Sequence, residues 1–241
     1  GESREELASL GTAAVIDVSF EVAKGETFVV MGLSGSGKST LIRMINGLWS
    51  PSEGTVEVAG KVVSDMNDAQ LRALRRDHVS MVFQHFALLP HLTVRENAAY
   101  GLKLQGKLKQ KERLEKANEW LNTVGLNGWG DKYPHQLSGG MQQRVGLARA
   151  LAAETDILLM DEAFSALDPL IRREMQDQLL ELQGALSKTI IFITHDLNEA
   201  MYLGDHIAVM RNGRVAQIGT SDEILTQPAD DYVADFVQDV D

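Results

Sequence analysis

The sequence predicts an α/β protein organised around a phosphate-binding loop, and three observations support this fold class. Residues 32–39 read Gly-Leu-Ser-Gly-Ser-Gly-Lys-Ser and fit the pattern G-x-x-x-x-G-K-[ST]. The apolar run 27–31 just before them has the length of a buried strand, and apolar residues at helical spacing follow over 41–48. Further apolar runs of strand length alternate with helical patterns downstream, as in an α/β sheet.

The loop has the chemistry to hold a nucleoside triphosphate. Its glycines let backbone N–H groups approach anionic oxygens near a helix N-terminus. Lys38 supplies a positive charge for the β- and γ-phosphates, and the Ser39 hydroxyl is suited to bind Mg²⁺. The alternative is a glycine-rich turn that only joins a strand to a helix, but such a turn does not require every position of the motif. The candidate phosphate contacts are Ser34, Gly35, Ser36, Gly37, Lys38, Ser39 and Thr40.

The composition disfavours several classes of protein. The longest apolar runs fall well short of the ~20 residues of a membrane span, so a role at a membrane would be peripheral. The net charge of −11 argues against a nucleic-acid partner, because such proteins carry a basic excess. The chain has no cysteine, which excludes disulfides and thiolate metal sites. No signal peptide is recognised at the N-terminus, and the chain begins with Gly1.

The elements around the phosphate loop follow from local patterns. Alternating apolar residues predict a half-buried strand over 15–22. Downstream of the loop helix we expect a hairpin, a short helix and a core strand, over residues 55–63, 67–76 and 80–83 respectively. Gln84 ends that strand.

The next stretch reads as a helical insert between strands of the core. Thr93 is expected to cap a helix that runs through Tyr100. A charged amphipathic helix is predicted over 107–124, ended by Gly125. Its inward-facing residues would be Leu114, Ala117, Leu121 and Val124.

Ser138, Gly139 and Gly140 open a third helix of this insert, which runs through Ala152. A serine and two glycines at a helix start leave N–H groups and the positive end of the helix dipole available to an anion. Taken alone, such a turn is usually only a helix cap. Its presence in one chain with a phosphate loop favours a second anion-binding site.

Two carboxylates follow the apolar strand 157–160. A buried strand of an α/β sheet delivers the residue at its carboxyl end to the ligand-binding edge, so Asp161 is placed to hold Mg²⁺ opposite Ser39. Glu162 is suited to orient or deprotonate an attacking water. Asp168 is a good N-cap before Pro169, and capping alone could explain both residues. Apolar residues then give the following helix an expected core-facing stripe, formed by Leu170, Ile171, Met175, Leu179, Leu182 and Leu186.

The last third contains one more candidate site residue. His195 ends the apolar strand 189–194, at the same expected sheet edge as Asp161. A lone histidine is more often structural than catalytic, but one at this edge would reach a γ-phosphate. Asn212-Gly213 predicts a hairpin between strands 206–210 and 214–218, and the acidic tail is expected to be partly helical.

The order of these motifs resembles the ATPase subunit of ABC transporters over nearly the whole chain. The resemblance rests on the phosphate loop, Gln84, the segments 137–143 and 157–162, Asp168 and His195. It implies one ABC ATPase domain over 1–241, with a RecA-like P-loop NTPase core (about 12–85 and 156–241), a small antiparallel sheet and a helical subdomain (about 86–155).

The same resemblance implies roles for particular residues. Glu162 would be the catalytic base, His195 the switch at the γ-phosphate, and Gln84 the sensor of Mg²⁺ and the attacking water. Two ATP molecules would lie in a head-to-tail homodimer, each between one phosphate loop and the partner's Ser138-Gly139-Gly140 turn, with Asp168 contacting across the interface. Residues 31–44, 83–91 and 160–172 further resemble the subfamily that imports glycine betaine, proline betaine and related quaternary amines.

These expectations define a peripheral subunit at the cytoplasmic face of the inner or plasma membrane. It would bind a membrane permease through residues 84–100 and act indirectly with a periplasmic or extracellular solute-binding protein. Internal packing of the helical insert is the alternative explanation for the apolar residues of 84–100. The alternative functions are import of another small solute, an exporter ATPase, a non-hydrolysing scaffold, or a soluble ABC ATPase acting on DNA or the ribosome. The acidic balance and the single ATPase unit disfavour the last of these.

Overall fold

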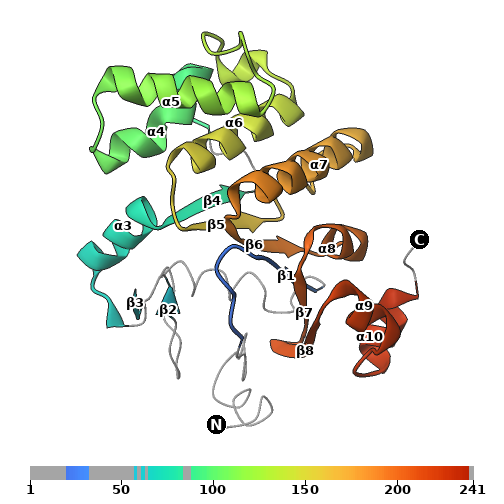
Figure 1. The fold of residues 1–241 in the computed structure, drawn as a ribbon. Coiled ribbons are helices and arrows are strands. Elements are labelled where there is room, and N and C mark those ends of the chain that lie inside the picture. Colours follow the sequence, from blue (N-terminus) through green and yellow to red (C-terminus); the bar gives the residue numbers. More distant parts are fainter. Residues whose placement is uncertain (1–19, 33–56, 59–60, 63–64, 84–87, 239–241) are drawn as a thin grey trace. The chain divides into compact units, whose positions relative to one another are not determined.

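The computed structural model describes residues 20–32, 57–58, 61–62, 65–83 and 88–238. The chain divides into two compact units. The outer unit comprises residues 1–65 and 188–241, and the middle unit comprises residues 66–187. Figure 1 shows the described elements of both, coloured along the sequence. Each unit has its own strands and helices, so each is considered separately.

A mostly parallel group of strands forms the centre of the outer unit. Its order is β6-β1-β7-β8, with bounds β1 Thr27–Met31, β6 Thr189–Thr194, β7 His206–Arg211 and β8 Arg214–Gly219. β1 lies parallel to both β6 and β7, and β8 pairs antiparallel with β7. All five residues of β1 are buried, as expected for a parallel strand with neighbours on both sides. A separate antiparallel pair is formed by β2 Glu57–Val58 and β3 Lys61–Val62.

Three helices complete the described part of the outer unit: α8 Leu197–Leu203, α9 Ser221–Thr226 and α10 Asp231–Val237. α8 packs on β1 and β6, and Gly204 at its end makes this close approach possible. A Cβ on Gly204 would lie 2.9 Å from Cγ2 of Val29. α9 packs on β8 and α10 on α9, while the Arg211 guanidinium lies 4.6 Å from the ring centre of Tyr232. This contact ties α10 to the strand β7.

The described residues of the middle unit form two parallel strands and six helical segments. Its elements are α3 Asp68–Asp77, β4 Val79–Phe83, α4 Val94–Gln105, α5 Gln110–Thr123, the 3₁₀ turn η2 Pro134–Gln136, α6 Gly139–Ala152, β5 Ile157–Asp161 and α7 Pro169–Leu186. β4 and β5 run parallel, and α4, α5 and α6 pack against one another. The three helices form the green-to-yellow group of Figure 1.

Side-chain caps explain where the helices of the middle unit begin. Asn67 and Gln70 form a capping box at α3, and Thr93 and Glu96 form another at α4. The backbone N–H of Thr93 donates to the Glu96 carboxylate, and this hydrogen bond holds the pKa of Glu96 below its ordinary value. These caps satisfy N–H groups that have no partner within the helix.

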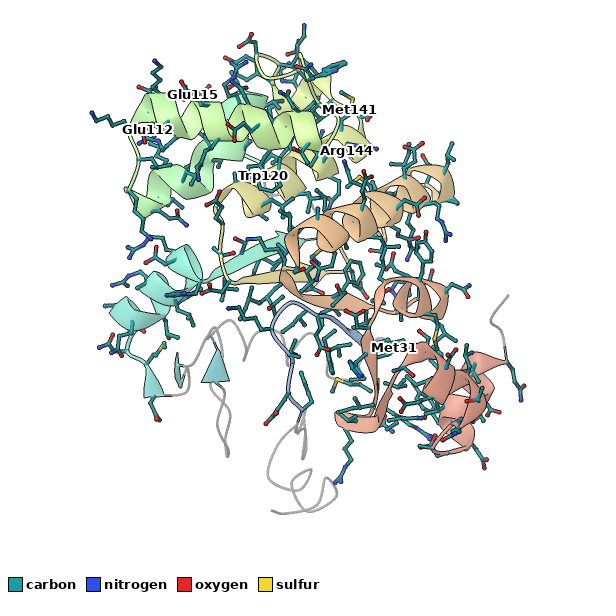
Figure 2. The ribbon with its side chains drawn as sticks, viewed as in Figure 1. Met31, Glu112, Glu115, Trp120, Met141 and Arg144 are labelled. Atoms are coloured by element: carbon teal, nitrogen blue, oxygen red, sulfur yellow. The ribbon has the colours of Figure 1, made fainter. Side chains whose placement is uncertain are left out.

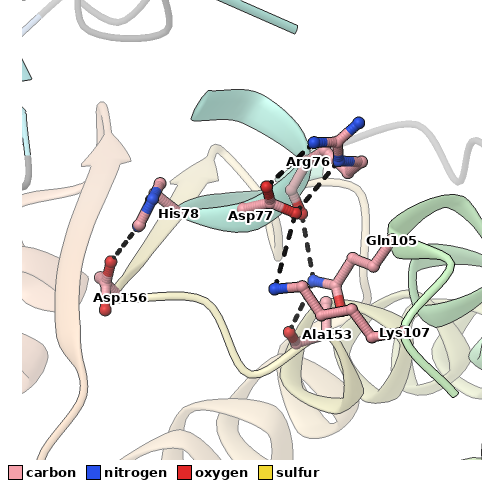
Figure 3. A network of polar contacts seen from close by, with 7 residues as sticks. All are labelled: Arg76, Asp77, His78, Gln105, Lys107, Ala153 and Asp156. Carbon is pink, nitrogen blue, oxygen red and sulfur yellow. Dashed lines mark hydrogen bonds and ion pairs between the residues drawn. The ribbon is translucent and has the colours of Figure 1, made fainter. Parts of the chain in front are cut away.

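Polar networks join helices of this unit that lie far apart in the sequence. Gln105 donates from Nε2 to the carbonyl oxygens of Arg76 (3.1 Å) and Ala153 (2.9 Å), which ties together the ends of α3, α4 and α6 (Figure 3). Arg144, labelled on α6 in Figure 2, donates from Nη1 to the carbonyl oxygen of Val124 and to Oε1 of Gln178. These contacts fix α6 between its neighbours.

The structure confirms most predicted elements and corrects several others. The strand over 27–31, the hairpins, the core strands and the capped helices are present. Residues 20–22 are not in a strand, although 15–22 was predicted as one; residues 15–19 lie outside the described part. The helix predicted to stop at Tyr100 continues to Gln105, and the one predicted from 107 begins at Gln110, because Gly106 ends α4 in the left-handed conformation.

The remaining corrections concern α7 and α8. Leu170 and Leu186 were expected on the core-facing stripe of α7, but 70% and 39% of their surfaces are exposed. Both lie in the terminal turns of the helix, beyond the packed central part around Met175 and Leu179. α8 was not predicted at all. The predicted helix over 41–48 and the N-terminal segment lie outside the described residues.

Candidate functional site

In the outer unit, Gly32 and His195 follow strands that end at one sheet edge. Met31, the last residue of β1, is in register with Thr194, the last residue of β6. Gly32, which begins the phosphate-loop motif, and His195 therefore follow two neighbouring parallel strands at their carboxyl ends. This is the edge at which α/β sheets bind their ligands.

His195 lies between two anchored residues. Thr194 is buried, and its Oγ1 accepts a hydrogen bond from the backbone N–H of Asp196 (3.0 Å). Asp196 caps α8 by accepting from the N–H of Glu199 (3.2 Å). The backbone on both sides of His195 is thus fixed, while the residue itself is exposed at the sheet edge. A histidine held in this way can present its ring to a ligand without ordering a flexible loop first.

In the middle unit, the two carboxylates lie at another strand edge, beside the end of β4. Phe83, the last residue of β4, is in register with Asp161, the last residue of β5. Gln84 directly follows Phe83 in the sequence, and Glu162 directly follows Asp161. Asp161 and Glu162 are both half-buried at this strand end.

Glu162 has a backbone conformation that is rare for its residue type. Its φ is +49°, in the left-handed region. The hydroxyl of Ser165 donates to the carbonyl oxygen of Glu162 (2.8 Å), and the backbone N–H of Ser165 donates to the same atom (3.2 Å). These bonds hold the turn after β5 in place. Residues in sparsely populated backbone conformations concentrate at functional sites, where the surroundings enforce a required geometry.

Two further candidate residues are helix caps, as their sequence context indicated. Asp168 accepts from the N–H of Ile171 (3.0 Å) at the start of α7, and Ser138 Oγ accepts from the N–H of Met141 (3.2 Å) at the start of α6. Ser138 and Gly139 are exposed. One oxygen of Asp168 and one hydroxyl lone pair of Ser138 are used in capping, so both residues retain acceptor capacity.

The structure adds contacts that the sequence patterns did not reveal. Gly140 packs so closely on α7 that a Cβ there would lie 2.6 Å from Cγ2 of Ile171. Gln143, on the same helix as Gly140, is buried, and its Nε2 lies 3.5 Å from the carbonyl oxygen of Phe83. The start of α6 is thus packed against α7 and reaches the end of β4. A glycine in the first helical turn was the only local signal of such close packing.

Several predicted site residues lie outside the described part of the chain: Ser34, Gly35, Ser36, Gly37, Lys38, Ser39, Thr40 and Gln84. The structure therefore describes the strands that end just before the phosphate-loop motif and Gln84, but not these residues themselves. Among the described residues, no three His, Asp or Glu side chains gather as a metal-binding group. No described helix has the length and apolarity needed to cross a membrane.

These arrangements can be compared with known proteins. A family model described as ABC transporter matches residues 15–165. The phosphate loop, Gln84 and Asp161 lie within that match in the expected order, and His195 lies beyond it. The chain belongs to the ABC transporter family.

Two relatives of this chain are named as ATP-binding proteins of glycine betaine transport. The chain is 58% identical over 243 residues to the glycine betaine transport ATP-binding protein OpuAA of Bacillus subtilis, covering 100% of this chain and 58% of that protein. It is 55% identical to the glycine betaine/proline betaine transport system ATP-binding protein ProV of Escherichia coli, covering 100% of this chain and 60% of ProV. The chain thus spans less than two thirds of the length of these relatives.

A solved structure shares the fold. The dimeric ATP-binding cassette MJ0796, in a post-hydrolysis state with ADP and Pi, superposes with a TM-score of 0.77 at 36% identity. The alignment covers 86% of this chain and 90% of that protein. The fold class predicted from the sequence, an α/β fold of the P-loop NTPase type, is confirmed by this likeness.

Proposed function

We propose that this chain is the ATP-binding and ATP-hydrolysing subunit of an importer for a quaternary amine such as glycine betaine or proline betaine. The observation that carries the solute class is the identity to glycine betaine transport ATP-binding proteins over the full length of this chain. The nucleotide chemistry is supported independently, by the phosphate-loop motif and by the residues that follow the strand ends.

ATP would be held by the phosphate loop. The residues assigned to this task are Ser34, Gly35, Ser36, Gly37, Lys38, Ser39 and Thr40, with Lys38 carrying the positive charge. Mg²⁺, when bound, neutralises phosphate charge and would be ligated by Ser39, Gln84 and Asp161. The half-buried carboxylate of Asp161 at a strand end fits this role, because carboxylate oxygens are ligands that Mg²⁺ prefers.

Glu162 is proposed as the general base that accepts a proton from the attacking water. Its support is the left-handed turn after β5, which the hydrogen bonds from Ser165 to the Glu162 carbonyl oxygen hold in place directly after Asp161. His195 is proposed to contact the γ-phosphate, supported by its anchored place beside the end of β1. Gln84 would orient the same water.

Dimerisation would complete the site. In a head-to-tail homodimer, each ATP would lie between one phosphate loop and the Ser138-Gly139-Gly140 turn of the partner, with Asp168 contacting across the interface. The exposed start of α6 supports this assignment, because backbone N–H groups at a helix N-terminus attract anions. Hydrolysis to ADP and phosphate, followed by release of the phosphate, would then remove the group that bridges the two subunits and open the dimer.

The proposal extends to the location of the subunit and to its domains. It would lie on the cytoplasmic face of the membrane, bound to a permease through residues 84–100 and served by an external solute-binding protein. The RecA-like core would span about residues 12–85 and 156–241, and the helical subdomain about residues 86–155. The alternatives are another small solute or a soluble, non-transport ABC ATPase.

The test is transport by the full-length subunit. The subunit is co-expressed with its neighbouring permease and solute-binding protein and reconstituted in liposomes. ATP hydrolysis and uptake of radiolabelled glycine betaine are recorded with and without the solute, and the Lys38→Ala complex gives the background. Hydrolysis that rises with betaine and is accompanied by uptake supports the proposal. Hydrolysis without a response to betaine retains the ATPase and rejects the solute class, and the absence of hydrolysis rejects both.

A further inference from the structure

A fully buried asparagine organises the turn that precedes α4. Asn97 has no exposed surface. Its Nδ2 donates to the carbonyl oxygens of Leu89 (3.0 Å), Leu92 (3.1 Å) and Thr93 (3.0 Å), and its Oδ1 accepts from the backbone N–H of Leu89 (2.8 Å). One side chain thereby takes up both main-chain groups of Leu89 and two further carbonyls. All of these residues belong to the middle unit.

The segment that Asn97 holds is a tight turn with an exposed tip. The N–H of Leu92 donates to the carbonyl of Leu89 (3.2 Å), and Pro90 occupies the second position, where its fixed φ favours a β-turn. Pro90 and His91 are exposed, whereas Leu88, Leu89 and Leu92 are half-buried. Pro90 and His91 therefore form the exposed tip of the turn, while its leucines are partly covered by the rest of the protein.

Only a side chain with both a hydrogen-bond donor and an acceptor can make the contacts that Asn97 makes. Aspartate would keep the acceptor for Leu89 N–H but would set a carboxylate against three carbonyl oxygens. Leucine would remove all four of these hydrogen bonds. The carbonyls of Leu89 and Thr93 would keep the backbone N–H groups of Leu92 and Asn97, but the N–H of Leu89 and the carbonyl of Leu92 would lose the partner that Asn97 supplies, which is costly. A fully satisfied buried polar group of this kind specifies one conformation of the backbone around it.

We propose that Asn97 is a positioning residue for coupling: it holds the Leu88–Leu92 turn in the one shape that the membrane subunit of the importer contacts. The inference rests on the proposed function, in which residues 84–100 bind the permease. Asn97 has no exposed surface, so within residues 84–100 it has no surface of its own to offer the permease. It acts through the turn, so its loss should separate ATP hydrolysis from uptake rather than stop hydrolysis.

The test compares Asn97→Asp with Asn122→Asp in the full-length subunit. Asn122 lies exposed on α5, so the same change of charge there is the matched control. Hydrogen–deuterium exchange of the subunit alone reports on the turn. We expect exchange of residues 88–93 to rise about tenfold in Asn97→Asp, with α6 unchanged, and no rise in the control. Unchanged exchange at 88–93 would overturn the positioning role.

The second measurement is the ratio of ATP hydrolysed to solute imported in the reconstituted transporter. Asn97→Asp should leave the ATPase of the subunit alone within about twofold while raising that ratio several-fold in the complex. A loosened turn with an unchanged ratio would show that Asn97 is only structural. Pro90→Gly loosens the exposed tip without changing the core, so it should raise the ratio even if Asn97→Asp fails to fold; an unchanged ratio for Pro90→Gly overturns the proposal.

The two proposals fail in different ways. A wild-type complex that imports no quaternary amine contradicts the proposed function and, with it, the coupling role, even if exchange at 88–93 responds to Asn97→Asp. A wild-type complex that imports the solute, combined with variants that keep the wild-type ratio, contradicts the role of Asn97 alone.

Discussion

Gly140 and Ile171 are packed so closely that a Cβ on the glycine would lie 2.6 Å from Cγ2 of the isoleucine. Gly140 lies in the first turn of α6 and Ile171 in the first turn of α7. The glycine at this site therefore has a packing role that is separate from any approach to phosphate. The two roles predict different behaviour in a pair of variants.

Gly140→Ala should lower the free energy of unfolding by about 1–3 kcal/mol, because the new methyl group overpacks the contact with Ile171. In the double variant Gly140→Ala with Ile171→Ala, the destabilisation should fall short of the sum of the single effects by about 1 kcal/mol. Denaturant unfolding measures both. Gly146→Ala is the control, since nothing lies within 4 Å of a Cβ there and alanine should stabilise the helix. Strict additivity would contradict the packing role.

Glu162→Gln should reduce ATP hydrolysis by roughly 10²–10⁴-fold, because glutamine cannot accept a proton from water. ATP binding should persist, so the variant should accumulate an ATP-bound dimer that size-exclusion chromatography with light scattering detects. Glu154→Gln is a matched control: Glu154 also has a φ of +49° but lies exposed, in an ion pair with Lys116. Turnover near wild type in Glu162→Gln would remove Glu162 from the role of base.

Lys38→Ala should weaken ATP binding by about tenfold to a hundredfold, the value of a charge-assisted hydrogen bond to phosphate. Titration with a fluorescent ATP analogue measures the affinity. Lys24→Ala, in an exposed turn before β1, removes the same charge away from the motif and should leave the affinity unchanged. Equal affinities in both variants would count against the phosphate assignment.

The capping box of α4 predicts a dependence of stability on pH. Hydrogen bonds from Thr93 lower the pKa of Glu96 in the folded chain. The stabilisation is therefore complete above the ordinary glutamate pKa of about 4.3 and is lost as the pH falls through the lowered value. Because Glu96 is exposed, the effect should be small, roughly half a kilocalorie per mole.

Thermal unfolding of wild type and Glu96→Gln between pH 7 and pH 3 measures this effect. The wild type should be the more stable at pH 7, and the difference should shrink toward pH 3. Glu112, labelled on α5 in Figure 2, holds the same third helical position after Lys109, an N-cap without a side-chain cap bond. Glu112→Gln should show a smaller dependence. A difference for Glu96→Gln that grows on acidification would refute the explanation.

Sequence patterns predicted those features that depend on short stretches of chain. The buried strand before Gly32 and the caps Thr93, Ser138 and Asp168 each follow from a few neighbouring residues. α8 was missed because seven residues make only about two turns, which is too short for a helical period to be recognised, although Asp196 is a recognisable N-cap. Gly106 was not recognised as a helix end because the charged pattern continues across it.

Contacts between distant residues could not be predicted in this way. The packing of Gly140 on Ile171 and the hydrogen bonds of Asn97 depend on how helices and turns meet in space. The exposure of Leu170 has a similar cause: helical periodicity gives the face on which a residue lies, but not where a neighbouring element ends. The motif residues were found in the sequence because their chemistry is local, whereas the groups that support them are not.

The strand registers restrict how the chain can change length during evolution. Side chains of a strand alternate between its two faces, so the loss of one residue within β5 would turn Asp161 to the other face of the sheet. The proposed metal ligand would then be lost in a single event, and the pairing of Phe83 with Asp161 would also shift. Insertions and deletions that preserve activity are therefore expected outside β4 and β5, and homologues should differ in length at the surface turns.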